Sequence, residues 1–164
     1  MSLRFPLHAC WMHRGQQKRI RAFSVANQSY HLIGAYNWRT DQVFSQAVER
    51  KNSQTFIQFL EYLLVGCFPT QKIVLVMDNA SYHRSKTVQA ALSLFEPRVR
   101  VFWLPKYCPE LNPIERFWRH LKDLACANKL DLSLENLAAR VRTIMGYQNS
   151  LDHVLKMSFL KNYV

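Results

Sequence analysis

The chain has 164 residues, a length that suits one domain with an adequate hydrophobic core. Hydrophobic residues make up 49% of it, and no run of about 18 apolar residues occurs, so the disordered, fibrous and membrane-spanning classes are excluded. Lysine and arginine number 22 against 11 acidic residues, which gives a net charge of +11. A charge of this size predicts an anionic partner, most often nucleic acid.

The basic residues are unevenly placed along the chain. No Asp or Glu occurs before Asp41, whereas this stretch carries Arg4, Arg14, Lys18, Arg19, Arg21 and Arg39. A transit peptide is also Arg-rich and acid-poor, but CWMHRGQQ carries a Trp and a Gly-Gln turn and lacks the serine-rich amphipathic pattern. The cysteines form no CxxC pair, which fits a reducing compartment better than a disulfide framework (Cys10, Cys67, Cys108 and Cys126).

The first half of the chain predicts an antiparallel hairpin followed by a helix. Residues 29–38 and 42–49 have the composition of strands, and WRTDQ between them suggests a tight turn. Ser53 is predicted to cap the helix at its start, and Gly66 is predicted to end it. Between them, apolar residues recur at helical spacing (Phe56, Phe59, Leu60, Leu63 and Leu64).

Strands and helices alternate in the second half. In KIVLVM (72–77), residues 73–77 form a short, wholly apolar run, which is typical of a strand buried on both faces. A helical stripe follows (Val88, Ala91, Leu92 and Phe95), then a strand at 99–104 and two helices, at about 112–128 and about 133–148. This order predicts a mixed sheet with helices on its faces, in which the strands at 72–77 and 99–104 are parallel.

Two carboxylates lie where this fold would bring them together. Asp78 directly follows the apolar strand, at the edge where ligands of such sheets bind. Asn112, Pro113 and Glu115 occupy the N-cap, N1 and N3 positions of a helix, so Glu115 either completes a capping box or points back at the strand ends. In the second arrangement the two acids can hold a hard cation such as Mg²⁺. Two such cations stabilise the attacking and leaving oxygens of a phosphodiester.

These motifs carry a resemblance to a known family. VLVMDNASYH, followed by LPKYCPELNPIERFWRHLK, closely resembles DDE-type transposases of the mariner-like superfamily, specifically the bacterial insertion-sequence family 630. The likeness covers nearly the whole chain: CWMHRGQQ resembles the family's Trp…Gly-Gln segment, LIGAYNW its second strand and NSQTFIQFLEYLL its first helix. The resemblance implies an RNase H-like fold and Mg²⁺- or Mn²⁺-dependent cleavage and transfer of DNA strands at insertion-sequence ends. It assigns Asp78 and Glu115 as the second and third catalytic acids, both metal ligands.

Part of the family pattern has no counterpart in this sequence. In the family, a strand ending in the first catalytic Asp precedes the Trp…Gly-Gln segment, and an N-terminal helix-turn-helix region binds DNA. Here no acid precedes Asp41, which falls in the predicted hairpin turn. We therefore expect residues 1–164 to be a single RNase H-like catalytic domain, N-terminally truncated, without the helix-turn-helix region. Loss of the first strand would expose an edge or leave a gap in the sheet.

The resemblance and the missing first acid together leave two possible functions. The first is DNA transposition by a chain that, alone, is inactive or very weak because it lacks the first acid and has an incomplete two-metal site. The alternative is a non-catalytic DNA-binding or dimerising remnant of a transposase. Both imply double-stranded DNA as the partner, a possible homodimer, no membrane, and a bacterial cytoplasmic, nucleoid-associated location.

Six further residues are candidates around the two acids. His83 either contacts phosphate or a metal ligand, or is a structural histidine at a helix start. Asn79 either orients Asp78 or makes an Asx turn, and the turn is favoured. The candidates for binding DNA phosphates are Lys106, Arg116, Arg119 and Lys122, whose alternative role is a solvated helix face.

Overall fold

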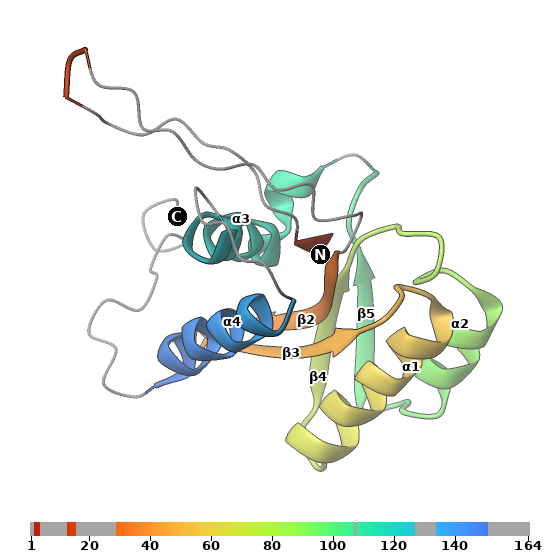
Figure 1. Ribbon diagram of the computed structural model, residues 1–164. Coiled ribbons are helices and arrows are strands. Elements are labelled where there is room, and N and C mark those ends of the chain that lie inside the picture. The colour runs from red at the N-terminus through yellow and green to blue at the C-terminus, as the bar shows by residue number, and fades with distance from the viewer. Residues whose placement is uncertain (1, 4–12, 16–28, 107, 127–133, 151–164) are drawn as a thin grey trace.

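The computed structural model describes residues 2–3, 13–15, 29–106, 108–126 and 134–150 (Figure 1). It confirms a mixed α/β architecture, and every predicted helix and strand is present. In chain order the elements are β1 (Ser2–Leu3), β2 (Tyr30–Asn37), β3 (Gln42–Val48), α1 (Ser53–Glu61), the π-helical η1 (Tyr62–Cys67), β4 (Ile73–Met77), α2 (Lys86–Ser93), β5 (Val99–Trp103), the 3₁₀ helix η2 (Pro109–Leu111), α3 (Pro113–Cys126) and α4 (Leu134–Asn149).

The strands form two sheets rather than one continuous sheet. β1, β2 and β3 make an antiparallel sheet in that order, and the predicted hairpin of β2 and β3 is confirmed. β4 and β5 make a parallel pair, in register from Ile73 opposite Val99 to Met77 opposite Trp103. Among the described residues, no strand lies between β2 and β4 to join the two sheets.

Helices cover both faces of the β2–β3 hairpin. α3 and α4 pack on one face, where Leu32 and Val43 join a core with Leu121 and Leu137. α1 packs on the other face, where Ile33 joins a second core that also includes α2 and the inner sides of β4 and β5. Figure 1 shows the three layers, with α3 and α4 on one side of the strands and α1 and α2 on the other. The hairpin is thus the centre of the fold.

The sheet of β4 and β5 is covered on one face. Val74 and Val76 are 61% and 52% exposed, and Phe102, which lies beside Val76, is 58% exposed. The prediction that strand 72–77 is buried on both faces is therefore wrong. The physical reason is that, among the described elements, helices α1 and α2 pack on the inner face of this sheet and none packs on the outer one.

The start of α1 differs by one residue from the prediction. Asn52, not Ser53, is the N-cap: its side chain accepts a hydrogen bond of 2.9 Å from Thr55 N, and Thr55 Oγ1 accepts one of 3.1 Å from Asn52 N. This reciprocal pair is a capping box built on Asn and Thr. Gly66 does not end the helix either, because η1 continues to Cys67.

Arg98 connects the end of η1 to the start of β5. Its guanidinium donates hydrogen bonds to the carbonyl oxygens of Leu64 (2.9 Å), Phe68 (2.5 Å) and Gln71 (3.3 Å). Helix ends leave carbonyl groups without intrahelical partners, and these bonds satisfy such groups. The segment between α1 and β4 is therefore held by a residue from a distant part of the chain.

The hairpin turn contains Asp41, as predicted. Asp41 has a left-handed backbone with φ 56°, and its carboxylate accepts a hydrogen bond from the Tyr36 hydroxyl. Gln148 of α4 donates to the Asp41 carbonyl at 3.1 Å. Burial and this carboxylate raise the pKa of Tyr36. Asp41 therefore serves the packing of the turn against α4.

Gly34 sets how closely α3 approaches the hairpin. A Cβ atom at this position would lie 2.8 Å from the Phe44 carbonyl oxygen and 2.8 Å from the Trp118 ring. The missing side chain lets Trp118 lie directly on β2. Since Glu115 is one helical turn before Trp118, this contact also fixes the position of Glu115.

Two global expectations can be compared with the described residues. None of the helices in these ranges is long and apolar enough to span a bilayer. The three cysteines within the described ranges, Cys67, Cys108 and Cys126, are free thiols. Cys10 lies outside them.

Candidate active site

Asp78 follows β4 at its carboxyl end. Its Oδ1 accepts a hydrogen bond of 3.1 Å from Ala80 N and lies 2.6 Å from Nδ1 of His83. The hydrogen bond with His83 is the largest cause that lowers the pKa of the Asp78 carboxyl; Ala80 N also lowers it, whereas partial burial acts in the opposite direction. The side chain is 48% exposed. Asp78 is therefore a charged carboxylate at neutral pH, with room to bind a further group.

His83 is held against Asp78 by aromatic packing. Its ring centroid lies 4.2 Å from that of Phe56 in α1 and 4.3 Å from that of Tyr82, and its side chain is only 13% exposed. A ring packed in this way has little freedom to turn. The structure thus places His83 where it fixes the orientation of the Asp78 carboxylate.

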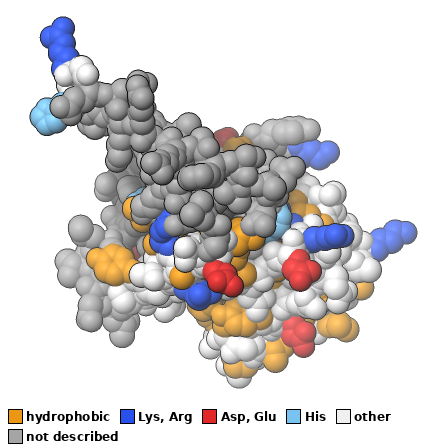
Figure 2. Space-filling model, viewed as in Figure 1, with side chains coloured by type: hydrophobic (Ala, Val, Ile, Leu, Met, Phe, Trp, Pro, Cys, Tyr) orange, Lys and Arg blue, Asp and Glu red, His pale blue; other side chains and the backbone are white. Residues whose placement is uncertain are grey.

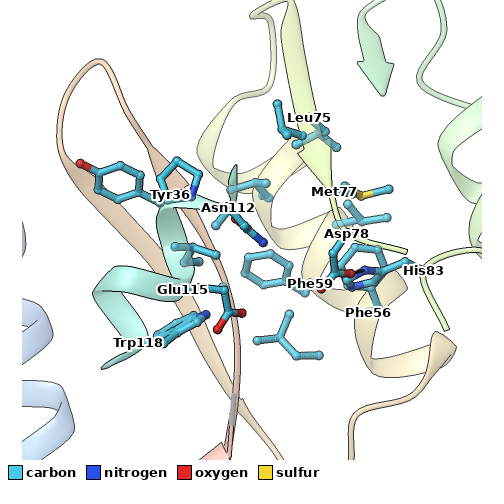
Figure 3. A pocket seen from close by; sticks show the side chains of 18 of the residues that line it. Tyr36, Phe56, Phe59, Leu75, Met77, Asp78, His83, Asn112, Glu115 and Trp118 are labelled. Carbon is cyan, nitrogen blue, oxygen red and sulfur yellow. Dashed lines mark hydrogen bonds and ion pairs between the residues drawn. The ribbon is translucent and has the colours of Figure 1, made fainter. Parts of the chain in front are cut away.

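Glu115 reaches the same region from α3. It lies in the first turn of that helix, as predicted, and its backbone N–H donates to the Asn112 carbonyl at 3.0 Å. Asp78 and Glu115 both line a cavity of about 370 Å³, together with Asn112, and both line a second, adjoining cavity. Figure 3 shows the two acids on opposite sides of the first cavity, Asp78 at the end of β4 and Glu115 on α3.

Tyr82 responds to both acids. Burial raises the pKa of its phenol, and the negative charges of Asp78 and Glu115 raise it further, in that order. Tyr82 also lines the first cavity together with Asp78 and Glu115, which the sequence did not indicate.

Asn79 ties the end of β4 to the end of β5. Its Nδ2 donates to the Leu104 carbonyl, and its Oδ1 accepts a hydrogen bond of 2.6 Å from Arg84 Nη1. The guanidinium of Arg84 lies 4.7 Å from the centre of the Trp103 ring. The short-range turn contact that was favoured for Asn79 is made by Asp78 instead, which accepts from Ala80 N.

Arg84 contacts Asn79, the residue after Asp78, and the ring of Trp103, and the sequence analysis missed these contacts. One signal was available: Arg84 follows Asn79 by five positions, as His83 follows Asp78. The turn after β4 folds back on itself, so that Asp78 and Asn79 each contact the side chain five positions later.

The four basic candidates lie in two places, the second cavity and helix α3. Lys106 lines the second cavity with Asp78 and Glu115. Arg116, Arg119 and Lys122 lie on α3; Arg119 and Lys122 are exposed, and Arg116 is half-buried. Figure 2 shows Lys and Arg side chains on the surface of this view, with acidic and hydrophobic ones among them. DNA binding by these four residues stays a prediction. Most of the basic N-terminal residues lie outside the described ranges (Arg4, Lys18, Arg19 and Arg21).

The donor set fits a hard divalent cation. Two carboxylates on one cavity are the kind of protein ligand that Mg²⁺ takes, with water and substrate oxygens completing its shell. No group of three or more His, Cys, Asp or Glu residues suited to a metal gathers within the described ranges. That Asp78 and Glu115 hold such an ion stays a prediction.

Comparison with known proteins identifies the family. A model of the DDE superfamily endonucleases matches residues 2–137. The chain belongs to this family. This DDE superfamily chain is 34% identical, over 137 residues, to the insertion element IS630 uncharacterized 39 kDa protein of Shigella sonnei. This match covers 84% of the chain, which spans only 39% of the length of that relative.

Solved structures confirm the RNase H-like fold of this DDE domain. The Mos1 transposase paired-end complex with left transposon end matches with a TM-score of 0.71 at 16% identity, covering 98% of the chain and 49% of the Mos1 chain. The Mos1 strand transfer complex matches with a TM-score of 0.70 at 17% identity, with the same coverage. At these identities the likeness supports the fold alone.

Proposed function

We propose that this chain supplies part of the catalytic domain of a transposase that cleaves and transfers DNA strands at insertion-sequence ends. The observation that carries the proposal is that Asp78 and Glu115, 37 positions apart in the sequence, line the same cavity. Membership of the DDE superfamily endonucleases and the net charge of +11 support it. The domain arrangement expected from the sequence, one RNase H-like catalytic domain, is part of this proposal.

The residues of the cavity have distinct roles in this reaction. A bound Mg²⁺ or Mn²⁺ would be held by Asp78 and Glu115 and would stabilise the charge that develops on a phosphodiester. His83 keeps the Asp78 carboxylate ionised and oriented; its contact of 2.6 Å and its lowering of the pKa of Asp78 support this role. Asn79 holds the Asp78 backbone in place through Leu104, and Lys106 binds a DNA phosphate at the second cavity.

The partner we propose is double-stranded DNA at the element's ends and target. Arg116, Arg119 and Lys122 would neutralise backbone phosphates along α3, which makes affinity fall steeply with salt concentration. A homodimer and a location in the bacterial cytoplasm, at the nucleoid, complete the proposal.

We further propose that the chain alone is inactive or very weak, because the described residues bring two carboxylates to the cavity and the family uses three. Nicking of terminal-repeat DNA by the purified chain in Mg²⁺, abolished by Asp78→Ala, would contradict this.

Thermal unfolding in the presence of Mg²⁺ or Mn²⁺ tests the cation site directly. A ligand that binds only the folded state raises the melting temperature as its concentration rises. We expect Mn²⁺ to raise the melting temperature of the wild-type chain, and we expect Asp78→Asn and Glu115→Gln each to remove most of that rise. Glu61→Gln, at an exposed position on α1 away from the cavity, is the matched control and should keep it.

The alternative is a DNA-binding or dimerising domain without catalytic function. It is favoured by the finding that no three-residue metal cluster forms within the described ranges. If the wild-type chain binds DNA with a strong salt dependence but its melting temperature does not respond to Mn²⁺, this alternative is supported and the catalytic proposal is not.

A further inference from the structure

Asp78 lies between two hydrogen bonds that join the ends of β4 and β5. On one side of it, the Met77 carbonyl accepts from Leu104 N at 2.9 Å. On the other side, the Asn79 side chain donates through Nδ2 to the Leu104 carbonyl. Figure 1 shows the two parallel strands side by side. The backbone of Asp78 is therefore held through both of its neighbours, and both bonds end at one residue that follows β5.

The second of these bonds depends on the orientation of the Asn79 amide. An amide has a donor end, Nδ2, and an acceptor end, Oδ1, and only the donor end can bind a carbonyl oxygen. Arg84 Nη1 donates to Oδ1 of Asn79 at 2.6 Å. Because a guanidinium has donors and no acceptor, it selects the orientation in which Nδ2 faces Leu104. Arg84 thus determines whether Asn79 makes the bond that joins the strand ends.

The Arg84 guanidinium is in turn held by the last residue of β5. Its Cζ lies 4.7 Å from the centre of the Trp103 ring, within the range of a cation–π contact. Arginine can stack on a ring and donate hydrogen bonds from its planar fork, and lysine has no such fork. No carboxylate within the described ranges forms an ion pair with this guanidinium. Its contacts with Trp103 and Asn79 therefore account for its position.

Arg84 acts on the candidate site from outside the two cavities. Asp78, Asn79 and Leu104 all line the second cavity, whereas Arg84 is absent from the lining of both. Its side chain is exposed, so it adds little to the hydrophobic core. Arg84 therefore shapes a wall of the second cavity without contacting what that cavity holds.

We propose that Arg84 is a positioning residue of the candidate active site. It fixes the Asn79 amide, the amide joins the ends of β4 and β5 at Leu104, and this bond holds Asp78 in the orientation that binds a cation. The statement about the cation rests on the proposed function, whereas the statement about the orientation of Asp78 does not. A role through charge alone predicts the reverse effect, because a positive charge near Asp78 repels a cation.

Amide hydrogen exchange without metal tests the orientation of Asp78. Ala80 N donates to Asp78 Oδ1 at 3.1 Å, so protection of this amide reports whether the carboxylate keeps its place. We expect Arg84→Lys to speed exchange of the Ala80 amide by about tenfold, because the ammonium lacks the planar fork that holds Asn79. The Gln89 amide, which donates to a carbonyl at the start of α2 at 3.0 Å, is the internal control and should exchange at the wild-type rate.

Two results of this measurement overturn the inference. One is an unchanged rate at Ala80 in Arg84→Lys. The other is equal acceleration at Ala80 and Gln89, which would mean that the substitution loosens the whole segment between β4 and α2 and that Arg84 has a general structural role.

The rise of the melting temperature with Mn²⁺ tests the effect on the cation. If Arg84 acted through its charge, Arg84→Gln would strengthen Mn²⁺ binding and Arg84→Lys would leave it unchanged. A positioning role predicts that both variants weaken binding, and we expect the apparent Kd to rise by about tenfold in each. Lys86→Gln, at an exposed position two residues further along, makes the same change of charge as Arg84→Gln and should not weaken binding.

Stronger Mn²⁺ binding by Arg84→Gln, or unchanged binding by Arg84→Lys, also overturns the inference. If the melting temperature of the wild-type chain does not respond to Mn²⁺, the proposed catalytic function fails instead. Exchange of the Ala80 amide, which is measured without metal, then decides by itself whether Arg84 positions Asp78.

Discussion

The hairpin of β2 and β3 has helices on both faces, whereas the sheet of β4 and β5 has helices on one. Leu32 and Ile33 are neighbours on β2 and are buried in two different cores, but Val74 and Val76 of β4 lie more than half exposed. Full burial of such a side chain stabilises the fold by about 1.5–3 kcal/mol, and partial exposure gives up much of this. Asp78 thus lies at the end of the β4–β5 sheet, which has helices on one face, and near the β2–β3 hairpin, which has helices on both.

The largest effect should come from the core that both sheets share. Phe59 of α1 is 2% exposed and packs in this core, whereas Phe102 on the outer face of β5 is 58% exposed. We expect Phe59→Ala to lower the free energy of unfolding by about 4 kcal/mol, because it leaves a cavity, and Phe102→Ala to lower it by less than about 1 kcal/mol. Urea denaturation measures both, and similar losses would remove the difference between the two faces.

The next effect tests how tightly α3 packs on the hairpin. Gly34→Ala places a Cβ atom 2.8 Å from backbone and from the Trp118 ring, so we expect a loss of about 2 kcal/mol through overpacking. Gly146→Ala in α4 is the matched change, since a Cβ there meets nothing within 4 Å and alanine favours helix. It should stabilise the protein by about 0.5–1 kcal/mol. If both substitutions lowered the free energy of unfolding, the space around Gly146 would be more crowded than the structure shows.

A smaller effect concerns pH and belongs to the end of β4. Because the folded state lowers the pKa of Asp78, this group stabilises the fold at pH values above its unfolded pKa, and the contribution is lost as pH falls through the folded value. The window therefore lies below about pH 4. His83→Leu removes the largest cause of the shift.

In the His83→Leu variant, we expect the pKa of Asp78 to move up toward its ordinary value. Carbon-13 NMR titration of the side-chain carboxyl measures the pKa in both proteins. An unchanged pKa would mean that Ala80 N, and not His83, determines the ionisation of Asp78.

The smallest effect is expected on the outer face of β4. Val74 is 61% exposed, so Val74→Thr keeps the branched side chain and places its hydroxyl in water. We expect a change within about 0.5 kcal/mol in the free energy of unfolding, measured in urea. A loss of 2 kcal/mol or more, on the order of a core substitution, would show that this face is covered in solution.

The sequence predicted the local elements better than their surroundings. Helical spacing identified α1 through Phe56, Phe59 and Leu60, and all three are buried. The cap moved from Ser53 to Asn52, because both residue types can cap and only the geometry decides between them. An apolar run such as KIVLVM shows that a strand can be buried on both faces, but burial depends on elements elsewhere that pack against it.

The candidate site was predicted in part. The positions of Asp78 and Glu115 at a strand end and a helix start followed from the order of elements, and both do line one cavity. The contacts of Asn79 with Leu104 and Arg84 did not follow, since they join residues that meet only through the pairing of β4 with β5. Tyr82 was missed because its place on the cavity beside Glu115 depends on how α3, a segment distant in the sequence, packs.

Arg98 has a consequence for how the protein opens. One guanidinium donates hydrogen bonds to the carbonyl groups of Leu64, Phe68 and Gln71. The end of η1, the loop after it and the start of β5 are therefore joined by one side chain. Segments joined in this way should unfold locally as one cooperative unit, so their backbone amides lose protection from hydrogen exchange together. Local unfolding at the start of β5 should therefore also loosen the loop that precedes β4. A change at this end of the strand pair can thus affect Asp78, which follows the other end of β4.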